Sequence, residues 1–266
     1  MNAETLIGTL QEGKPVFGVQ LISTSPMLLP FVDKIGPDFI FLDLEHIPMD
    51  REIVSWMCRA FSAKGIMPFV RVPEPNPSLI CQQLDAGAEG IIVPYIEDAA
   101  RVSSLVGAVR YRPLKGAYLK EKLKGNYEFN KATKEFLKGD VWNANPKDKM
   151  LLINIESVPG MEHLEEILKV PGIDGVMIGP QDLSVSLGIP EQYESEAYDR
   201  AVGEIARKVT ERGLYCGIHF AVTPKQGIHF MKDYGIRILL EANEMVAFTR
   251  DVGERLREMR EEADRL

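Results

Sequence analysis

Short apolar segments alternate with longer amphipathic segments along most of the chain. The apolar segments are rich in Val, Ile, Leu and Phe, which is typical of strands that are covered on both faces of a sheet. In the segments between them, apolar residues recur at the spacing of a helix that buries one face. The pattern predicts strands over residues 16–22, 39–45, 67–72, 90–96, 150–156, 175–179, 215–220 and 236–241.

A helix is expected after each of these strands, because parallel strands have to be joined by a crossover connection. Eight consecutive strand-then-helix units predict a (β/α)8 TIM barrel that forms a single domain over residues 1–266. A doubly wound open sheet is the competing fold. The predicted helices cover residues 26–35, 51–63, 77–85, 98–109, 161–168, 196–212, 224–233 and 245 to the end.

Two segments depart from this rhythm. Residues 115–149 are polar and rich in Lys and Asn, and they are too long for a plain loop, so we expect an irregular excursion beside the barrel mouth. A lid, an oligomer contact and mere decoration are all compatible with it. The last helix is strongly charged, with a possible apolar stripe at Val252, Leu256 and Met259. It is either a solvated outer helix or a helix that is exchanged between subunits.

The charge balance limits the possible partners. The net charge is −8, and no basic stripe stands out, which argues against a nucleic-acid partner. An acidic protein that handles an anionic substrate needs a local positive centre, either a metal ion or a well-placed arginine. We therefore expect a small-molecule substrate and one such centre.

The cysteines and the lack of long apolar segments indicate where in the cell the protein is expected. The three cysteines are widely spaced and form no CxxC pair, so the sequence supports neither a zinc site nor a disulfide framework. We expect them to be buried small apolar residues. The first residues lack the apolar core of a secretory signal, and no run of about 18 apolar residues could span a membrane. The expected location is the cytoplasm, with no membrane partner.

Polar side chains at the predicted strand ends are the candidates for chemistry. In a (β/α)8 barrel the catalytic side chains project from the carboxyl ends of the strands and from the loops that follow. An apolar strand with a purely structural role would not be expected to carry polar side chains at these positions. The candidates are Asp43, Glu45 and His46 after the second strand, Arg71 in the third, Asn154 and Glu156 in the fifth, and Asp182 after the sixth.

Glu156 and Asp182 suggest a site for a divalent metal ion. Carboxylate oxygens suit a hard cation such as Mg²⁺, which binds few protein ligands and retains open positions for substrate oxygens. The carboxylate and keto oxygens of a 2-oxo acid could fill two such positions, and the metal would then stabilise an enolate as a Lewis acid. The bland alternatives are a salt-bridged barrel glutamate at 156 and a helix cap at Asp182.

His46 and Arg71 are the candidates for proton transfer and charge stabilisation. A neutral imidazole held by a carboxylate is a common general base near pH 7, and Asp43 lies close enough in sequence to orient the ring. The planar guanidinium of Arg71 suits a substrate carboxylate, a keto oxygen or a developing enolate. A structural histidine and an internal ion pair of Arg71 are the alternatives.

Together these strand ends resemble the HpcH/HpaI aldolase family of the pyruvate/phosphoenolpyruvate barrel superfamily. The likeness extends from about Phe17 to Gly188 and continues more weakly to the end. The set of stretches in this order is specific, although each alone would be weak. The matching stretches are Asp43-Leu44-Glu45-His46, Phe69-Val70-Arg71, Leu84-Asp85-Ala86-Gly87 with Val93-Pro94, Ile155-Glu156, and Ile178-Gly179-Pro180-Gln181-Asp182-Leu183-Ser184.

The resemblance implies an aldolase that joins a pyruvate enolate to an aldehyde, forming or cleaving 4-hydroxy-2-oxo acids. It implies Mg²⁺, Mn²⁺ or Co²⁺ on Glu156 and Asp182, and hexamers or trimers in which the last helix packs on a neighbouring subunit. The remaining roles it implies are as follows: the turn Gly179-Pro180-Gln181-Asp182 with Asn154 for substrate binding, Arg71 on the keto oxygen, His46 with Asp43 for proton transfer, and Asp85 near the site.

Several positions depart from the family pattern. Asn154 replaces a usual glutamine, Gln20 replaces a common tryptophan, the loop 111–116 is short, and residues 241–244 replace a small-residue turn. The sequence therefore supports the reaction of pyruvate better than it identifies the aldehyde partner. We expect the residues of the aldehyde pocket to differ from those of other family members. A citryl- or malyl-CoA lyase-like enzyme and a non-catalytic barrel that binds a 2-oxo acid or metal are the alternative functions.

Overall fold

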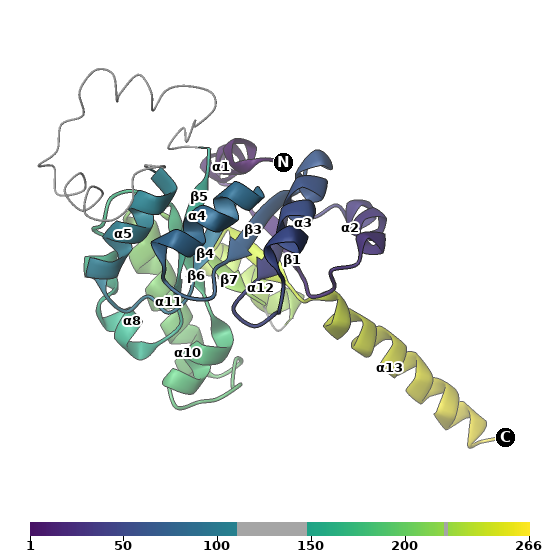
Figure 1. Cartoon of the computed structure of the whole chain (residues 1–266). Helices are drawn as coiled ribbons and strands as arrows, with labels where there is room; N and C mark the ends of the chain where they lie inside the picture. The colour runs from purple at the N-terminus through teal and green to yellow at the C-terminus, as the bar shows by residue number, and fades with distance from the viewer. Residues whose placement is uncertain (111–147, 221–222) are drawn as a thin grey trace, which may run out of the picture.

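A computed structural model of the chain describes residues 1–110, 148–220 and 223–266. Its eight strands are parallel and consecutive, and β8 pairs with β1, which closes the barrel (Figure 1). The predicted (β/α)8 barrel is thus confirmed, and the open doubly wound sheet is excluded. The strands are β1 Val16–Leu21, β2 Phe39–Asp43, β3 Met67–Arg71, β4 Gly90–Val93, β5 Met150–Ile155, β6 Gly175–Ile178, β7 Tyr215–His219 and β8 Ile238–Glu241.

Helices surround this barrel, and most begin where the sequence predicts. Several begin at a proline that follows a capping side chain, as in α4, where Asn76 accepts a hydrogen bond from the Ser78 N–H. The helices are α1 Ala3–Gln11, η1 Pro26–Leu28, α2 Leu29–Ile35, α3 Arg51–Ala63, α4 Pro77–Ala86, α5 Ala99–Arg110, α8 Val158–Glu162, α9 Leu164–Ile167, α10 Pro180–Ser186, α11 Glu196–Glu211, α12 Pro224–Asp233 and α13 Glu244–Ala263.

The strands bury side chains on both faces, as their continuous apolar runs require. One set packs outward against the helices, and the other fills the barrel with large side chains such as Phe39, Phe69 and Met177. Glycine leaves the space for two of these: a Cβ on Gly18 would lie 2.1 Å from the Phe39 ring, and one on Gly90 would lie 2.2 Å from the Phe69 ring. The lower barrel is therefore a packed core, which leaves its carboxyl end as the expected place for a ligand.

Helix α1 was not predicted, because the first residues read as a polar segment. Its apolar residues Ala3, Leu6 and Leu10 are buried against residues at the start of the strands, so the helix closes the amino end of the barrel. Asn2 caps it by accepting a hydrogen bond from the Thr5 N–H at 2.8 Å. The signals were present in the sequence: an asparagine cap and apolar residues at helical spacing.

Other differences are local. The predicted helix 26–35 is a 3-10 turn followed by α2, and the predicted helix 161–168 is the pair α8 and α9. Helix α10 was not expected, although Pro180 at its first position favours a helix start. The predicted excursion 115–149 and the short loop 111–116 lie almost entirely outside the described residues.

Two expectations about composition can be compared with the structure. All three cysteines are buried and none forms a disulfide with another described residue, as the sequence predicted. Among the described residues, no helix combines the length and the apolar character that a membrane crossing needs.

Candidate active site

A cavity of about 320 Å³ opens at the carboxyl end of the barrel. Residues alternate along each strand between the inside and the outside of the barrel. The last inward residues of four strands line this cavity, and all four are polar, in contrast to the apolar layers below them: Gln20 of β1, Asp43 of β2, Arg71 of β3 and His219 of β7. The lining residues are Gln20, Ile22, Asp43, His46, Ile47, Arg71, Glu156, Gly179, Pro180, Gln181, Asp182, His219, Phe220 and Asn243.

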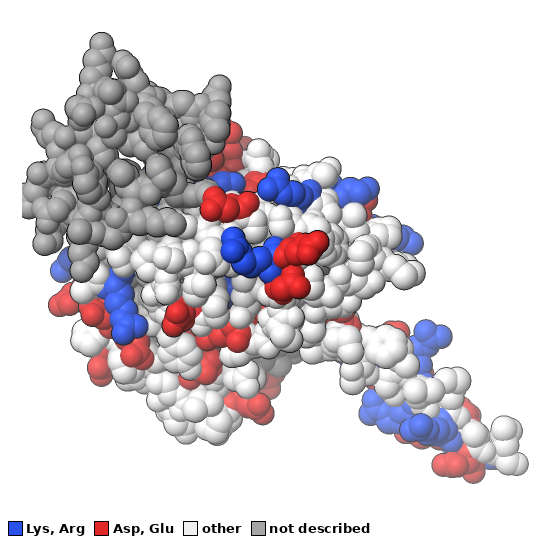
Figure 2. All heavy atoms as spheres, in the orientation of Figure 1, with Lys and Arg blue, Asp and Glu red and all other residues white. Residues whose placement is uncertain are grey.

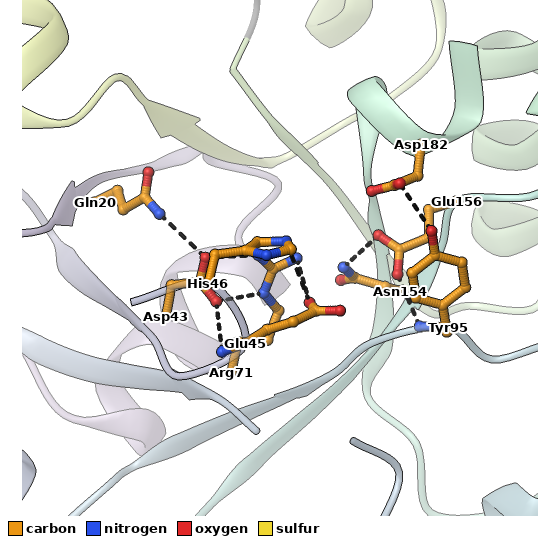
Figure 3. Close-up of polar contacts among 9 residues, drawn as sticks. All are labelled: Gln20, Asp43, Glu45, His46, Arg71, Tyr95, Asn154, Glu156 and Asp182. Carbon is orange, nitrogen blue, oxygen red and sulfur yellow. Dashed lines mark hydrogen bonds and ion pairs between the residues drawn. The ribbon is translucent and has the colours of Figure 1, made fainter. Parts of the chain in front are cut away.

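Arg71 is held by two carboxylates on one side of the cavity (Figure 3). Asp43 lies beside it in the β2–β3 register and accepts hydrogen bonds from Nε at 2.8 Å and from the second guanidinium nitrogen at 2.6 Å. Glu45 lies 3.0 Å from the remaining nitrogen. Burial alone would raise the pKa of Asp43, but the bonds from Arg71 lower it below its usual value. Arg71 is thereby fixed in one orientation with its charge retained.

His46 lies at the rim of the cavity, and its side chain is 60% exposed. Its Nε2 atom is 3.8 Å from the Glu45 carboxylate, which is too long for a hydrogen bond. We expected Asp43 to orient this ring, but the structure directs both Asp43 oxygens to Arg71 instead. The nearest carboxylate to the imidazole in this region is Glu45, which sequence reasoning named only as a strand-end residue.

Glu156 follows β5 on the opposite side of the cavity and is only 2% exposed. One oxygen accepts a hydrogen bond from the Tyr95 N–H at 2.7 Å, and the other accepts from Asn154 Nδ2 at 2.9 Å. Burial raises the pKa of Glu156, and these bonds together with Arg71 offset the rise only in part. A Cβ at Gly179 would lie 2.3 Å from Glu156 Oε2, so the glycine is needed to leave room for the carboxylate.

Asp182 lies in the first turn of α10 and is joined to Glu156 through Tyr95 (Figure 3). The Tyr95 hydroxyl donates to Asp182 Oδ1 at 2.8 Å, while its backbone N–H binds Glu156. Tyr95 has φ +48°, a conformation that costs free energy for a residue with a side chain. The strain is tolerated at the point where one residue contacts both carboxylates.

Two predicted site residues lie elsewhere. Asn154 is completely buried beneath Glu156 and is not among the described residues that line the cavity, so its contact is with the carboxylate rather than with a substrate. Asp85 lies on the exposed surface of α4, on the outside of the barrel. Within one copy of the chain it does not reach the cavity, and its assignment to the site stays a prediction.

Sequence reasoning missed Tyr95 and His219 as site residues, and it noted Gln20 and Asn243, the latter within residues 241–244, only as departures from the family pattern. His219 ends β7 and could have been found by the same rule that found Arg71, since both are the last inward residues of their strands. Tyr95 gave no comparable signal, because the contacts it makes depend on its unusual backbone conformation.

A family model described as HpcH/HpaI aldolase/citrate lyase matches residues 17–233. The chain belongs to this family. The expected resemblance is thus confirmed over most of the chain, including β2 to β7 and all but the first residue of β1. The activity expected from it, that of a carbon–carbon lyase of the aldolase type, is confirmed by the relatives.

Among curated proteins, 2-keto-3-deoxy-L-rhamnonate aldolase of Klebsiella pneumoniae is 32% identical over 81% of this chain and 78% of its own length. Hydroxypyruvate/pyruvate aldolase of Deinococcus radiodurans is 30% identical over 81% of this chain and 76% of its own length. The crystal structure of an HpcH/HpaI aldolase from Desulfitobacterium hafniense matches with a TM-score of 0.81 and 24% identity, over 96% of both chains, and supports the fold.

HpcH/HpaI aldolases depend on a divalent metal ion, and the carboxylate pair of this chain fits one. Glu156 is a buried carboxylate whose nearest partners are neutral donors, and a cation would compensate its charge. Asp182 presents a second hard oxygen donor close by. The described part of the chain contains no group of three or more His, Cys, Asp or Glu side chains placed to hold a metal ion.

Tyr95→Phe is expected to weaken metal binding about tenfold, because residues that orient metal ligands typically contribute 10- to 100-fold in affinity. The variant loses the hydroxyl that holds Asp182 but keeps the backbone bond to Glu156. Titration with Mn²⁺, followed by its electron paramagnetic resonance signal, measures the change. Tyr215→Phe at the start of β7 is the control, and equal affinities in both variants would show that Tyr95 does not orient the ligand.

Proposed function

We propose that this family member forms and cleaves 4-hydroxy-2-oxo acids through the enolate of pyruvate, with Mg²⁺, Mn²⁺ or Co²⁺ as cofactor. The observation that carries the proposal is that Arg71 and the Glu156–Asp182 pair line one cavity. A guanidinium and a carboxylate-bound cation on the same cavity suit a substrate whose negative charge grows during the reaction.

Glu156 and Asp182 would hold the metal ion, which when bound supplies Lewis-acid stabilisation of negative charge. The carboxylate of pyruvate would accept hydrogen bonds from the main-chain N–H groups of Gln181 and Asp182, since the first turn of a helix leaves such groups without partners. Pro180 has no N–H, and Gly179 leaves room beside Glu156.

Arg71 would donate to the keto oxygen of the oxo acid. In cleavage, the bond between C3 and C4 breaks and C4 becomes the carbonyl carbon of the aldehyde. The electron pair of the broken bond forms the enolate of pyruvate, whose oxygen faces the guanidinium. The ion pairs with Asp43 and Glu45 keep Arg71 oriented before substrate binds, so little reorganisation is needed during the reaction.

His46 would remove the proton from the C4 hydroxyl in cleavage, directly or through water, and that proton would then pass to C3 of the enolate to give pyruvate; synthesis reverses both transfers. His46→Ala is expected to lower kcat by about 10²- to 10⁴-fold, the usual contribution of a general base, with less effect on KM for the oxo acid. Steady-state kinetics measure the two constants, and His163→Ala on the outer surface is the matched control. An unchanged kcat would remove His46 from proton transfer.

The proposed activity is tested by pyruvate release from a racemic 4-hydroxy-2-oxo acid, coupled to lactate dehydrogenase. Release should require added Mg²⁺, Mn²⁺ or Co²⁺ and stop with EDTA. Release that is unaffected by EDTA in metal-stripped protein would contradict the proposed role of the metal, and no release from several such acids would contradict the substrate class.

We further propose that α13 packs on another copy of the chain, in a homo-oligomer. The helix has no buried residue and extends away from the barrel (Figure 1). Near the barrel its surface is largely uncharged, and charges of both signs lie further out (Figure 2). At about 100° per residue, an apolar stripe falls within an arc of about 80°. It consists of Met245, Phe248, Val252, Leu256 and Met259.

A groove on the barrel provides a place for such a helix. It has a volume of about 250 Å³ and lies over β1 and β8 beside α12, with Phe17, Ile228 and Leu239 on its walls. In a (β/α)8 barrel the eighth helix normally covers this position. Since α13 of the same chain points away, α13 of a second copy is the occupant that we propose.

The double variant Phe248→Glu and Leu256→Glu is expected to reduce the oligomer to a smaller species, because it places charges in the apolar stripe. Light scattering after gel filtration gives the mass. The matched control is Arg250→Glu with Arg257→Glu on the opposite side of the helix, which should retain the wild-type mass. A wild-type mass of one chain, 29.8 kDa, would contradict the proposal.

A further inference from the structure

Three polar side chains at the ends of neighbouring strands line the cavity away from the carboxylate pair. Gln20 ends the inward row of β1, His219 ends that of β7, and Asn243 follows β8. In the closed barrel, β7, β8 and β1 are adjacent, whereas Glu156 and Asp182 follow β5 and β6. The reaction on pyruvate described above uses none of these three residues.

His219 has an unsatisfied hydrogen-bonding atom. The residue is 4% exposed, and its Nε2 atom is buried with no hydrogen-bond partner among the described residues. The Phe41 and Phe220 rings lie beside it, with centroids 5.0 and 6.2 Å away. Burial, with Arg71 nearby, lowers the pKa of His219 to about 3, so the ring is neutral. A buried nitrogen of this kind is costly unless a ligand satisfies it.

Gln20 and Asn243 are held in a defined orientation. Gln20 Nε2 donates to Asp43 at 3.4 Å, and since a carboxylate only accepts, the amide oxygen of Gln20 must face the other way. Asn243 Nδ2 donates to that oxygen at 3.3 Å. The two amides therefore form an ordered polar wall beside His219, with hydrogen-bonding capacity left over for a ligand.

The charges around the cavity select against a second anionic group. The described lining residues include the three carboxylates Asp43, Glu156 and Asp182 but a single arginine, Arg71. Asp43 already neutralises much of that arginine. A ligand group placed against Gln20, His219 and Asn243 thus meets neutral donors and acceptors, with no cation to balance a carboxylate or phosphate.

We propose that Gln20, His219 and Asn243 form the subsite for the aldehyde partner and bind the hydroxyl groups of a short, uncharged hydroxyaldehyde. A hydroxyl both donates and accepts, so it satisfies the imidazole in either neutral tautomer and the amides in their observed orientation. A site built to bind a hydroxyl discriminates strongly against an analogue that lacks it, because its polar groups are then left unpaired. This inference rests on the proposed aldolase function.

The experiment compares glyceraldehyde with propanal, two three-carbon aldehydes that differ in their hydroxyl groups, as partners for pyruvate. The quantity measured is the ratio of their kcat/KM values, in which effects common to both aldehydes cancel. His219→Leu should lower the preference for glyceraldehyde at least tenfold. His219→Gln places an amide near the Nε2 position and should retain most of it, and His163→Leu on the outer surface should match the wild type.

The exchange of pyruvate C3 protons without aldehyde is measured in the same samples. This measurement separates a failure of the proposed aldolase function from a failure of the proposed aldehyde subsite. Exchange in His219→Leu with an unchanged aldehyde ratio overturns the subsite and leaves the proposed function standing. No exchange in the wild type overturns both. If His219→Leu does not fold, Gln20→Leu gives the same comparison, and an unchanged ratio there overturns the subsite.

Discussion

Glu156→Gln is expected to lower metal-dependent turnover by a factor on the order of 10³ or more, since Lewis-acid stabilisation supplies several kcal/mol of the lowered barrier. The substitution keeps the size of the side chain and removes the charge. The Gln oxygen can accept from the Tyr95 N–H, as Glu156 does at 2.7 Å. Its NH2 group can donate to Asn154 Oδ1, which is buried without a partner among the described residues, once the Asn154 amide turns over. The fold should therefore persist while the metal ligand is lost.

The same variant should be at least as stable as the wild type without metal. Burial raises the pKa of Glu156, so the charged carboxylate costs more free energy in the folded chain than in the unfolded chain, and a neutral side chain avoids that penalty. The comparison requires Mn²⁺ affinity, turnover and the urea midpoint of both proteins, with Glu162→Gln on α8 as the control. Wild-type turnover in Glu156→Gln would remove this residue from the metal site.

Arg71→Met is expected to reduce the free energy of unfolding by about 3–5 kcal/mol, the usual cost of removing one partner from a buried ion pair. The side chains of Arg71 and Asp43 are 7% and 2% exposed, so the pair is largely shielded from water. Glu45 would lose its cation as well. Turnover should fall together with stability, because the same guanidinium faces the keto oxygen in the proposed reaction.

The double variant Arg71→Met with Asp43→Asn separates these two effects. Removing the second charge should restore part of the lost stability, because no uncompensated carboxylate then remains at position 43. It should not restore turnover, since the guanidinium is still absent. Urea unfolding and kinetics on the two variants provide the test. A double variant no more stable than Arg71→Met would show that the Asp43 charge is not what destabilises the single variant.

The barrel was predictable because its physical requirements are local. Each strand is buried on both faces and therefore reads as a continuous apolar run, and each crossover helix has its own cap and stripe. Short elements were the ones missed. Helix α1 buries only three residues, and α10 is a single short helix after a strand end, so neither produces a long periodic signal.

The candidate site was predictable where a polar residue interrupts an apolar strand, as Arg71 and Glu156 do. The contacts between site residues were harder to predict, because they depend on the register between strands. The register of β2 and β3 places Asp43 next to Arg71, so Asp43 binds Arg71 and does not orient His46. His219 shows the opposite case. The alternation rule reaches it, yet its importance emerges only when the structure leaves its Nε2 atom buried without a partner.

The most direct test of the account is the exchange of pyruvate C3 protons in D2O, followed by NMR, with and without Mg²⁺ or Mn²⁺. Exchange reports enolate formation and requires no knowledge of the aldehyde. The account predicts exchange that depends on the metal, stops with EDTA and is absent in Glu156→Gln. Wild-type protein that binds the metal but leaves the pyruvate protons unexchanged would contradict it.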